Sequence, residues 1–126
     1  MVVHLRLGDA ISTGRYKNDT KYVPMLNKVL KKLMDTKTPK QTIIHSDGKI
    51  DTIIDPDLLK RCRCYDKNVP VEQVFSDMVH ADILVCGKSG FSLVASFLGN
   101  QNIVMIPDDE KHSLPSFVNY VRFSNV

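Results

Sequence analysis

One stretch of the sequence decides the fold: residues 81–99, which read ADILVCGKSGFSLVASFLG. The apolar run over 81–86 predicts a buried strand, and the small polar residues of 87–90 predict a turn. The run over 91–98 predicts a helix, which Gly99 ends. A strand that leads through a short turn into a helix is the building unit of parallel α/β domains.

The same alternation extends outward along the whole chain. Strands are expected over residues 2–7, 41–45, 61–65, 102–106 and 120–123. Helices are expected from about residue 21 until 36–40 break the pattern, and from Pro70 onward, with a short helix or loop near Asp55-Pro56. Strands alternating with helices indicate a parallel sheet with helices on both faces. We therefore expect one Rossmann-like, three-layer α/β domain over residues 1–126.

Each of the two expected helices has an apolar face. Between residues 21 and 36, one face carries Leu26, Val29, Leu30 and Leu33, while Lys28, Lys31 and Lys32 point away from it. After Pro70, one face carries Val71, Val74, Phe75, Met78 and Val79. Both helices are thus expected to pack against the sheet.

Composition excludes several classes of protein. Of the 126 residues, 17 are Lys or Arg and 14 are Asp or Glu, so the net charge is +3, and no block of five like charges occurs. Nucleic-acid binding is not expected, whereas a small anionic ligand needs only one or two cations. The apolar runs are far shorter than the roughly 20 residues of a membrane span, so no span is expected. With no signal peptide in view, the default location is the cytoplasm, or the Golgi lumen for a fragment of a eukaryotic enzyme.

The cysteines point to neither disulfides nor metal. Cys62, Cys64 and Cys86 give an odd count, so reduced thiols are expected. The Cys62-x-Cys64 spacing does not match a zinc knuckle, and no second pair is present. Cys86 is expected to be a small core residue.

Ligands of parallel sheets bind beyond the carboxyl ends of the strands, which selects three places. At the first, His4 and Arg6 share one face of a strand that runs into Gly8 and Asp9. An arginine at a strand end offers a planar fork to a phosphate. The alternative is a structural ion pair between Arg6 and Asp9, with His4 in the core.

The second place follows the next strand, where Ser46-Asp47-Gly48-Lys49 comes after His45. A carboxylate at this position can accept hydrogen bonds from a purine or a ribose. The alternative for Asp47 is a plain Asp-Gly turn.

The third place is the turn that opens the stretch quoted first. Backbone N–H groups and the hydroxyls of Ser89 and Ser92 would converge on an anion at the helix amino terminus, with Ser89 as the N-cap. Gly87-Lys88-Ser89 ends like a P-loop. The first glycine of that motif would have to stand at position 82, which is Asp82, so ATPase chemistry is not supported.

Taken in order, the three places resemble the nucleotide-sugar-binding half of fucosyltransferases of the α1,2, α1,6 and protein O-linked type. The His-x-Arg-Arg-x-Asp signature of that family is matched by residues 4–9, HLRLGD. Its Ser/Thr-Asp pair is matched by Ser46 and Asp47. Its Ser-Ser-Phe-Ser type turn is matched by residues 88–92, KSGFS. The resemblance covers roughly residues 2–106.

The resemblance implies a GDP-sugar donor, usually GDP-fucose, and inverting transfer to a hydroxyl of a glycan or protein without a metal or other cofactor. It also implies the donor lobe of a two-lobed GT-B enzyme, with the acceptor lobe on a preceding segment or a partner chain. Arg6 would be the catalytic residue, acting on the β-phosphate and the departing GDP. Substrate contacts would come from the residues that match the three motifs, namely His4, Arg6, Gly8, Asp9, Ser46, Asp47, Lys88, Ser89, Gly90, Phe91 and Ser92.

The chain departs from the family at Leu7, where a second arginine is often found. This leaves room for another GDP-sugar. It also keeps open two alternatives to an enzyme: a non-catalytic nucleotide-sugar-binding module that acts through a partner, and a plain α/β interaction domain whose strand-end residues are structural.

Overall fold

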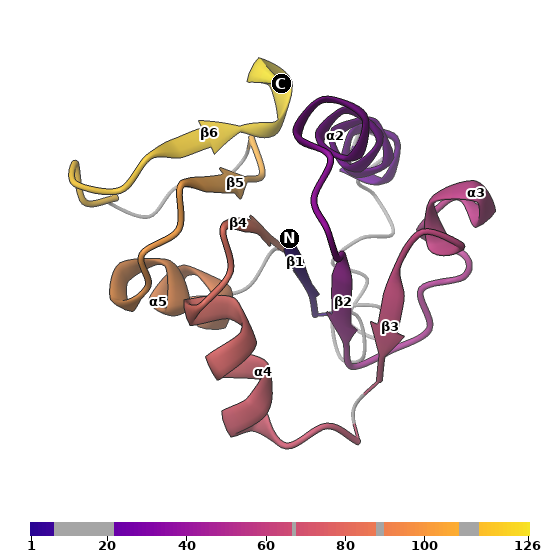
Figure 1. Ribbon diagram of the computed structural model, residues 1–126, viewed down its shortest axis with the longest axis horizontal. Coiled ribbons are helices and arrows are strands. Elements are labelled where there is room, and N and C mark those ends of the chain that lie inside the picture. The colour runs from indigo at the N-terminus through magenta and orange to yellow at the C-terminus, as the bar shows by residue number, and fades with distance from the viewer. Residues whose placement is uncertain (7–21, 67, 88–89, 109–113) are drawn as a thin grey trace.

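The computed structural model describes residues 1–6, 22–66, 68–87, 90–108 and 114–126 of the chain. Its centre is a six-stranded sheet, shown in Figure 1, in which every pair of neighbouring strands is parallel. The strands are β1 (Val2–Leu5), β2 (Ile43–Ser46), β3 (Arg63–Tyr65), β4 (Ile83–Cys86), β5 (Ile103–Ile106) and β6 (Tyr120–Arg122).

Helices cover both faces of this sheet and make a three-layer molecule (Figure 1). One face carries α2 (Tyr22–Lys37), α3 (Pro56–Leu59) and the short 3-10 helix η1 (Phe123–Asn125). The other face carries α4 (Val71–Val79) and α5 (Gly90–Leu98), which pack against each other. The expected Rossmann-like α/β fold is confirmed.

The strand order is β3-β2-β1-β4-β5-β6. The chain moves outward from β1 to β3, returns to the other side of β1 with β4, and then moves outward again. The direction in which successive strands are added to the sheet therefore reverses between β1 and β4. In doubly wound sheets the carboxyl ends of the strands at such a reversal form a crevice that binds ligands.

Alternation along the strands divides the core into two halves. Val3 and Leu5 of β1 face α2 and α3, whereas Val2 faces α4 and α5. All three side chains are buried, and the four residues of β4 are buried on both faces. Continuous apolar strands of this kind are typical of parallel sheets that are covered on both sides.

The predicted elements agree with the structure in type, and differ mostly at their ends. Strand β1 ends at Leu5 rather than at residue 7, so Arg6 follows the strand. Helix α2 runs through Thr36 and Lys37, which were expected to break it, because neither residue is a strong helix breaker. Gly90 was expected in the turn but is the first residue of α5.

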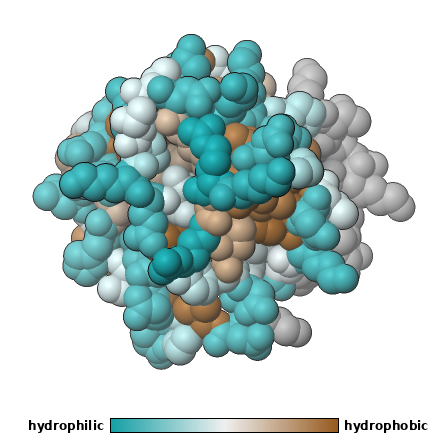
Figure 2. Space-filling view, turned by 45° about the vertical axis from the view of Figure 1, so that its right-hand side comes forward, coloured by the Kyte–Doolittle hydropathy of each residue, from teal (hydrophilic) through white to brown (hydrophobic). Residues whose placement is uncertain are grey.

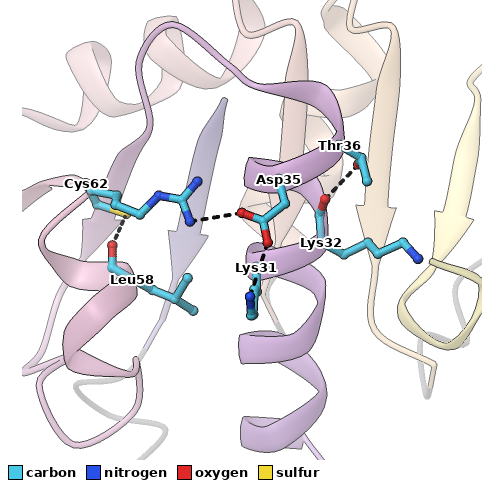
Figure 3. A network of polar contacts seen from close by, with 7 residues as sticks. Lys31, Lys32, Asp35, Thr36, Leu58 and Cys62 are labelled. Atoms are coloured by element: carbon cyan, nitrogen blue, oxygen red, sulfur yellow. Dashed lines mark hydrogen bonds and ion pairs between the residues drawn. The ribbon is translucent and has the colours of Figure 1, made fainter.

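Two polar networks join α2 to the segment around α3. The amide of Asn27 donates to the carbonyls of Val23 (2.9 Å) and Ile53 (2.8 Å), and its oxygen accepts from the N–H of Asp55 (2.8 Å). Figure 3 shows the second network, in which Asp35 accepts from Lys31 and from the guanidinium of Arg61, both at 3.2 Å. The first network is buried and the second is exposed, so the first contributes more to stability.

Figure 3 also shows that the thiol of Cys62 donates to the carbonyl of Leu58 at 3.1 Å. Burial raises the pKa of Cys62 to about 11, so this group is a thiol at neutral pH. None of the three cysteines forms a disulfide, and Cys86 is fully buried in the core as expected.

The face that brings the α3 side of the molecule forward is largely hydrophilic, with apolar side chains visible only in small patches (Figure 2). The apolar side chains of this half of the molecule are instead buried beneath α2 and α3, where they form part of the core. Within the described part of the chain, none of the helices combines the length and the apolar character that crossing a membrane requires.

Candidate functional site

A pocket of about 350 Å³ opens at the carboxyl ends of β1 and β2, on the side of the sheet covered by α4 and α5. This volume lies within the range of small-molecule sites. Residues from the first three strand ends and from both helices line it, namely His4, Arg6, His45, Ser46, Asp47, Asp66, Val69, Val71, Val74 and Phe91. The first two predicted places are thus brought together, with Phe91 from the third.

The end of β1 supplies His4 and Arg6 to this pocket, as their alternation predicted. Burial lowers the pKa of His4 to about 4, and the neighbouring His45 and Arg6 act in the same direction against the opposing effect of Asp47. His4 is therefore neutral at pH 7, whereas Arg6 is exposed and carries a full positive charge.

The end of β2 supplies Ser46 and Asp47. The hydroxyl of Ser46 donates to the carbonyl of Gly48 (2.9 Å) and accepts from the N–H of Gly48 (3.1 Å), so it holds the turn. Asp47 is exposed and lines the pocket. A turn at this place is therefore compatible with ligand binding, because Ser46 holds the turn while Asp47 lines the pocket.

The sequence reasoning missed His45, which precedes this pair. His45 lies opposite His4 in the parallel register of β1 and β2, and its side chain is 3% exposed. Its Nε2 lies 2.7 Å from a carboxylate oxygen of Asp77 on α4, and its ring stacks on Tyr65 with centroids 5.3 Å apart. The sequence contained a signal for His45, because His4 and His45 each stand on a strand two positions before a charged residue that lines the pocket.

Close approach of backbone shapes the pocket where β1 meets β4. A Cβ atom on Gly87 would lie 2.6 Å from the carbonyl oxygen of His4, so only glycine fits there. Phe91 packs close to these strand ends. The centroid of its ring lies 5.4 Å from that of His4 and 5.5 Å from that of Phe75. These ring contacts join Phe75 of α4 and Phe91 of α5 to the end of β1.

Beyond β3 and at the start of α4 lies a wall that the sequence reasoning also missed. Val69, Val71 and Val74 give it apolar surface, and Asp66 adds a carboxylate next to it. Val71 was expected to face the core but is 58% exposed, because it stands at the first position of α4, beyond the sheet. Apolar walls around a few polar groups are typical of pockets for small organic ligands.

The remaining predicted residues divide into two groups. Gly8, Asp9, Lys88 and Ser89 lie outside the residues that the structure describes. Ser92 is buried in the first turns of α5 and Gly90 is exposed at its start, and neither is among the residues that line the pocket.

A second cavity, of about 600 Å³, lies at the opposite edge of the sheet, near Lys37, Lys40, His80 and Asp82. It opens at the amino ends of β1 and β4, where parallel sheets do not bind their ligands as a rule. Within the described residues, no three His, Cys, Asp or Glu side chains are grouped as a metal ion would require.

The pocket at the carboxyl ends thus offers one guanidinium, carboxylates, two histidines and apolar walls. Such a set can hold an anion at the Arg6 end and a flat polar ring between valines and carboxylates. Comparisons with family models, with curated proteins and with solved structures found no match to this chain.

Proposed function

We propose that this domain binds the nucleotide of a GDP-sugar, GDP-fucose by resemblance, and acts as the donor half of an inverting glycosyltransferase. One observation carries the proposal. The strand order places His4, Arg6 and Asp47, which match two motifs of the fucosyltransferases, around one pocket at the carboxyl edge.

The charges along the pocket favour one orientation of the nucleotide. Arg6 stands at the end of β1, beside the point where the strand order reverses, and suits the diphosphate. Asp47 and Asp66 stand at the ends of β2 and β3, and carboxylates accept hydrogen bonds from a ribose or a base. Guanine carries a ring N–H and an amine side by side, which suits this acceptor-rich end.

In the transfer step, an acceptor hydroxyl attacks the anomeric carbon of the sugar while the bond between that carbon and the β-phosphate oxygen breaks, and the hydroxyl proton passes to solvent. Negative charge grows on the departing GDP. The planar guanidinium of Arg6 can stabilise that charge through two parallel hydrogen bonds, which is an electrostatic contribution to catalysis.

A second candidate function is a nucleotide-sugar-binding module that performs no transfer. Leu7 favours it, because the family often has a second arginine at this position. The two functions differ in what they require of Arg6: transfer needs it against the β-phosphate, whereas a module can hold guanosine without it.

Calorimetric titration of the purified chain with GDP, GDP-fucose, GDP-mannose, UDP and ATP, with and without a chelator, tests the proposal. We expect the guanine nucleotides to bind about tenfold or more tightly than UDP and ATP, an energy difference of ~1.4 kcal/mol. Equal affinity for UDP and GDP, or binding that the chelator abolishes, contradicts it.

A matched pair of variants locates the binding site. Asp47→Ala should weaken GDP binding by about 1–3 kcal/mol, because a donor on the bound base or ribose then loses its acceptor. Asp82→Ala removes an exposed carboxylate at the opposite edge of the sheet and should leave GDP affinity unchanged.

A further inference from the structure

The pocket wall contains two histidines, His4 and His45, whose Nδ1 atoms are both buried without a hydrogen-bond partner among the described residues. The side chain of His45 is 3% exposed, and its other ring nitrogen contacts a carboxylate. Buried polar atoms of this kind are rare in folded proteins, because each one costs free energy until a partner satisfies it. Since His45 lines the pocket, a bound ligand is the natural source of that partner.

The contacts of His45 decide which of its nitrogens carries the hydrogen. Nε2 lies 2.7 Å from one carboxylate oxygen of Asp77, and a carboxylate only accepts hydrogen bonds. The other oxygen of Asp77 accepts from the amide of Gln73 at 2.7 Å, which fixes the carboxylate in turn. Nε2 therefore donates, and in the form of the ring that carries its single hydrogen on Nε2, Nδ1 keeps a lone pair that can accept a hydrogen bond.

The surroundings keep the ring in place. Tyr65 stacks on one side at 5.3 Å, and the strand register sets His4 beside it on β1. His4 is itself neutral at pH 7. His45 is thus a rigid acceptor at the end of the pocket where Asp47 and Asp66 also present acceptors.

We propose that His45, locked by Asp77, is a specificity-determining residue whose Nδ1 accepts a hydrogen bond from an N–H on the edge of the bound base. This inference rests on the proposed function, because it assumes a guanine nucleotide in the pocket. Asp77 is then a positioning residue: it touches no ligand and selects the form of the ring that leaves Nδ1 as the acceptor. Because Nδ1 is buried in the unliganded pocket, the ligand reaches it with a small adjustment of the pocket floor.

Two substitutions separate this role from a structural one. His45→Asn keeps a polar atom near the position of Nδ1 and loses the contact with Asp77. His45→Gln keeps an amide that can donate to Asp77 and leaves nothing at the position of Nδ1. A residue that only holds α4 to the sheet would tolerate Gln better than Asn, whereas a residue that reads the base would tolerate Asn better than Gln.

The experiment measures GDP affinity by calorimetry for the wild type and both variants, with unfolding curves as a control for folding. We expect His45→Gln to weaken GDP binding about tenfold, while His45→Asn stays within about threefold of the wild type. The reverse ranking, or equal affinities, overturns the inference while the proposed function stands. A wild type that does not bind GDP refutes the proposed function itself.

A spectroscopic measurement does not depend on substituting His45. In protein labelled with ¹⁵N, the Nδ1 resonance of His45 should have the shift of an unprotonated nitrogen and should move on addition of GDP. IDP, which lacks the exocyclic amine, tests whether that amine is the donor, whereas 2′-deoxy-GDP, which lacks a ribose hydroxyl, should move the Nδ1 resonance as GDP does. Asp77→Asn should shift both ring nitrogens and weaken GDP binding. An Nδ1 resonance that GDP leaves unchanged contradicts the inference.

Discussion

Arg6 is exposed and follows β1 rather than lying within it, so its side chain is not part of the core. We expect Arg6→Ala to weaken GDP binding by about 1.5–3 kcal/mol, the range for a hydrogen bond to a charged group. Arg6→Lys should recover only part of this, because a lysine lacks the planar fork. Calorimetry gives the affinities.

Guanosine serves as the control ligand for Arg6. It lacks phosphates, so both Arg6 variants should bind it as the wild type does, and the free energy of unfolding should change by no more than about 0.5 kcal/mol. If guanosine binding falls as much as GDP binding, Arg6 acts on the base or on the fold rather than on the diphosphate.

His4 makes the stability of the fold depend on pH. Its pKa is about 4 in the folded protein against an ordinary value of 6.5, so the unfolded chain binds the proton more readily. Stability is therefore full above pH 6.5, falls as the pH drops from 6.5 toward 4, and loses nothing more from this group below that. By pH 5 the loss should be about 2 kcal/mol.

Denaturant unfolding of the wild type and of His4→Gln at pH 7, 6 and 5 measures this effect. The glutamine variant cannot take up the proton, so its stability should fall by less over the same interval. Parallel curves for the two proteins would show that the pH dependence originates elsewhere.

At the scale of elements, the backbone of Gly87 after β4 lies so close to the backbone of β1 that no side chain fits between them. Gly87→Ala places a Cβ 2.6 Å from the carbonyl oxygen of His4, which must push the two strand ends apart. We expect a loss of about 1–3 kcal/mol in the free energy of unfolding, together with weaker GDP binding. Gly90→Ala is the matched control for stability, because nothing lies within 4 Å of its added Cβ.

The attachment of α2 to the segment before α3 depends on Asn27. Its buried amide makes three hydrogen bonds to backbone groups, so Asn27→Ala leaves buried donors and acceptors unpaired. The free energy of unfolding should fall by about 1–3 kcal/mol. Lys28→Ala, on the exposed side of the same helix, should change it by less than about 0.5 kcal/mol. Equal effects of both substitutions would contradict this reading of Asn27.

The helices and strands also show which parts of the fold and of the pocket could be predicted from the sequence. Helix α2 and strand β4 follow from local patterns, because Leu26 and Leu30 repeat at helical spacing and the residues of β4 are all apolar. The pairing of His45 with Asp77 joins residues 32 positions apart. No local sequence pattern determines at which position along β2 a side chain of α4 makes contact. Sequence reasoning therefore found His4, Arg6 and Asp47, and missed the group that α4 positions.

At the scale of the molecule, the pocket draws on β1, β2, the segment after β3, α4 and α5. A ligand that touches all of these stabilises the whole domain through a single cooperative transition. At a GDP concentration of 100 times the dissociation constant, the free energy of unfolding should rise by about 2.7 kcal/mol. Thermal unfolding with increasing GDP measures this, and a midpoint that UDP raises equally contradicts the predicted preference.

The size of the pocket leads to the last prediction. A volume of about 350 Å³ is at the lower end of ligand sites and suits a nucleotide without an acceptor beside it. The sugar of GDP-fucose should therefore project beyond the described pocket, and GDP-fucose should bind this chain within about threefold of GDP, or ~0.7 kcal/mol. Because transfer also needs an acceptor hydroxyl held against the anomeric carbon, the isolated chain should show no measurable turnover. Calorimetry with both ligands and an assay with GDP-fucose and a panel of glycan and peptide acceptors test this. Robust transfer by the isolated chain would mean that these residues also hold the acceptor.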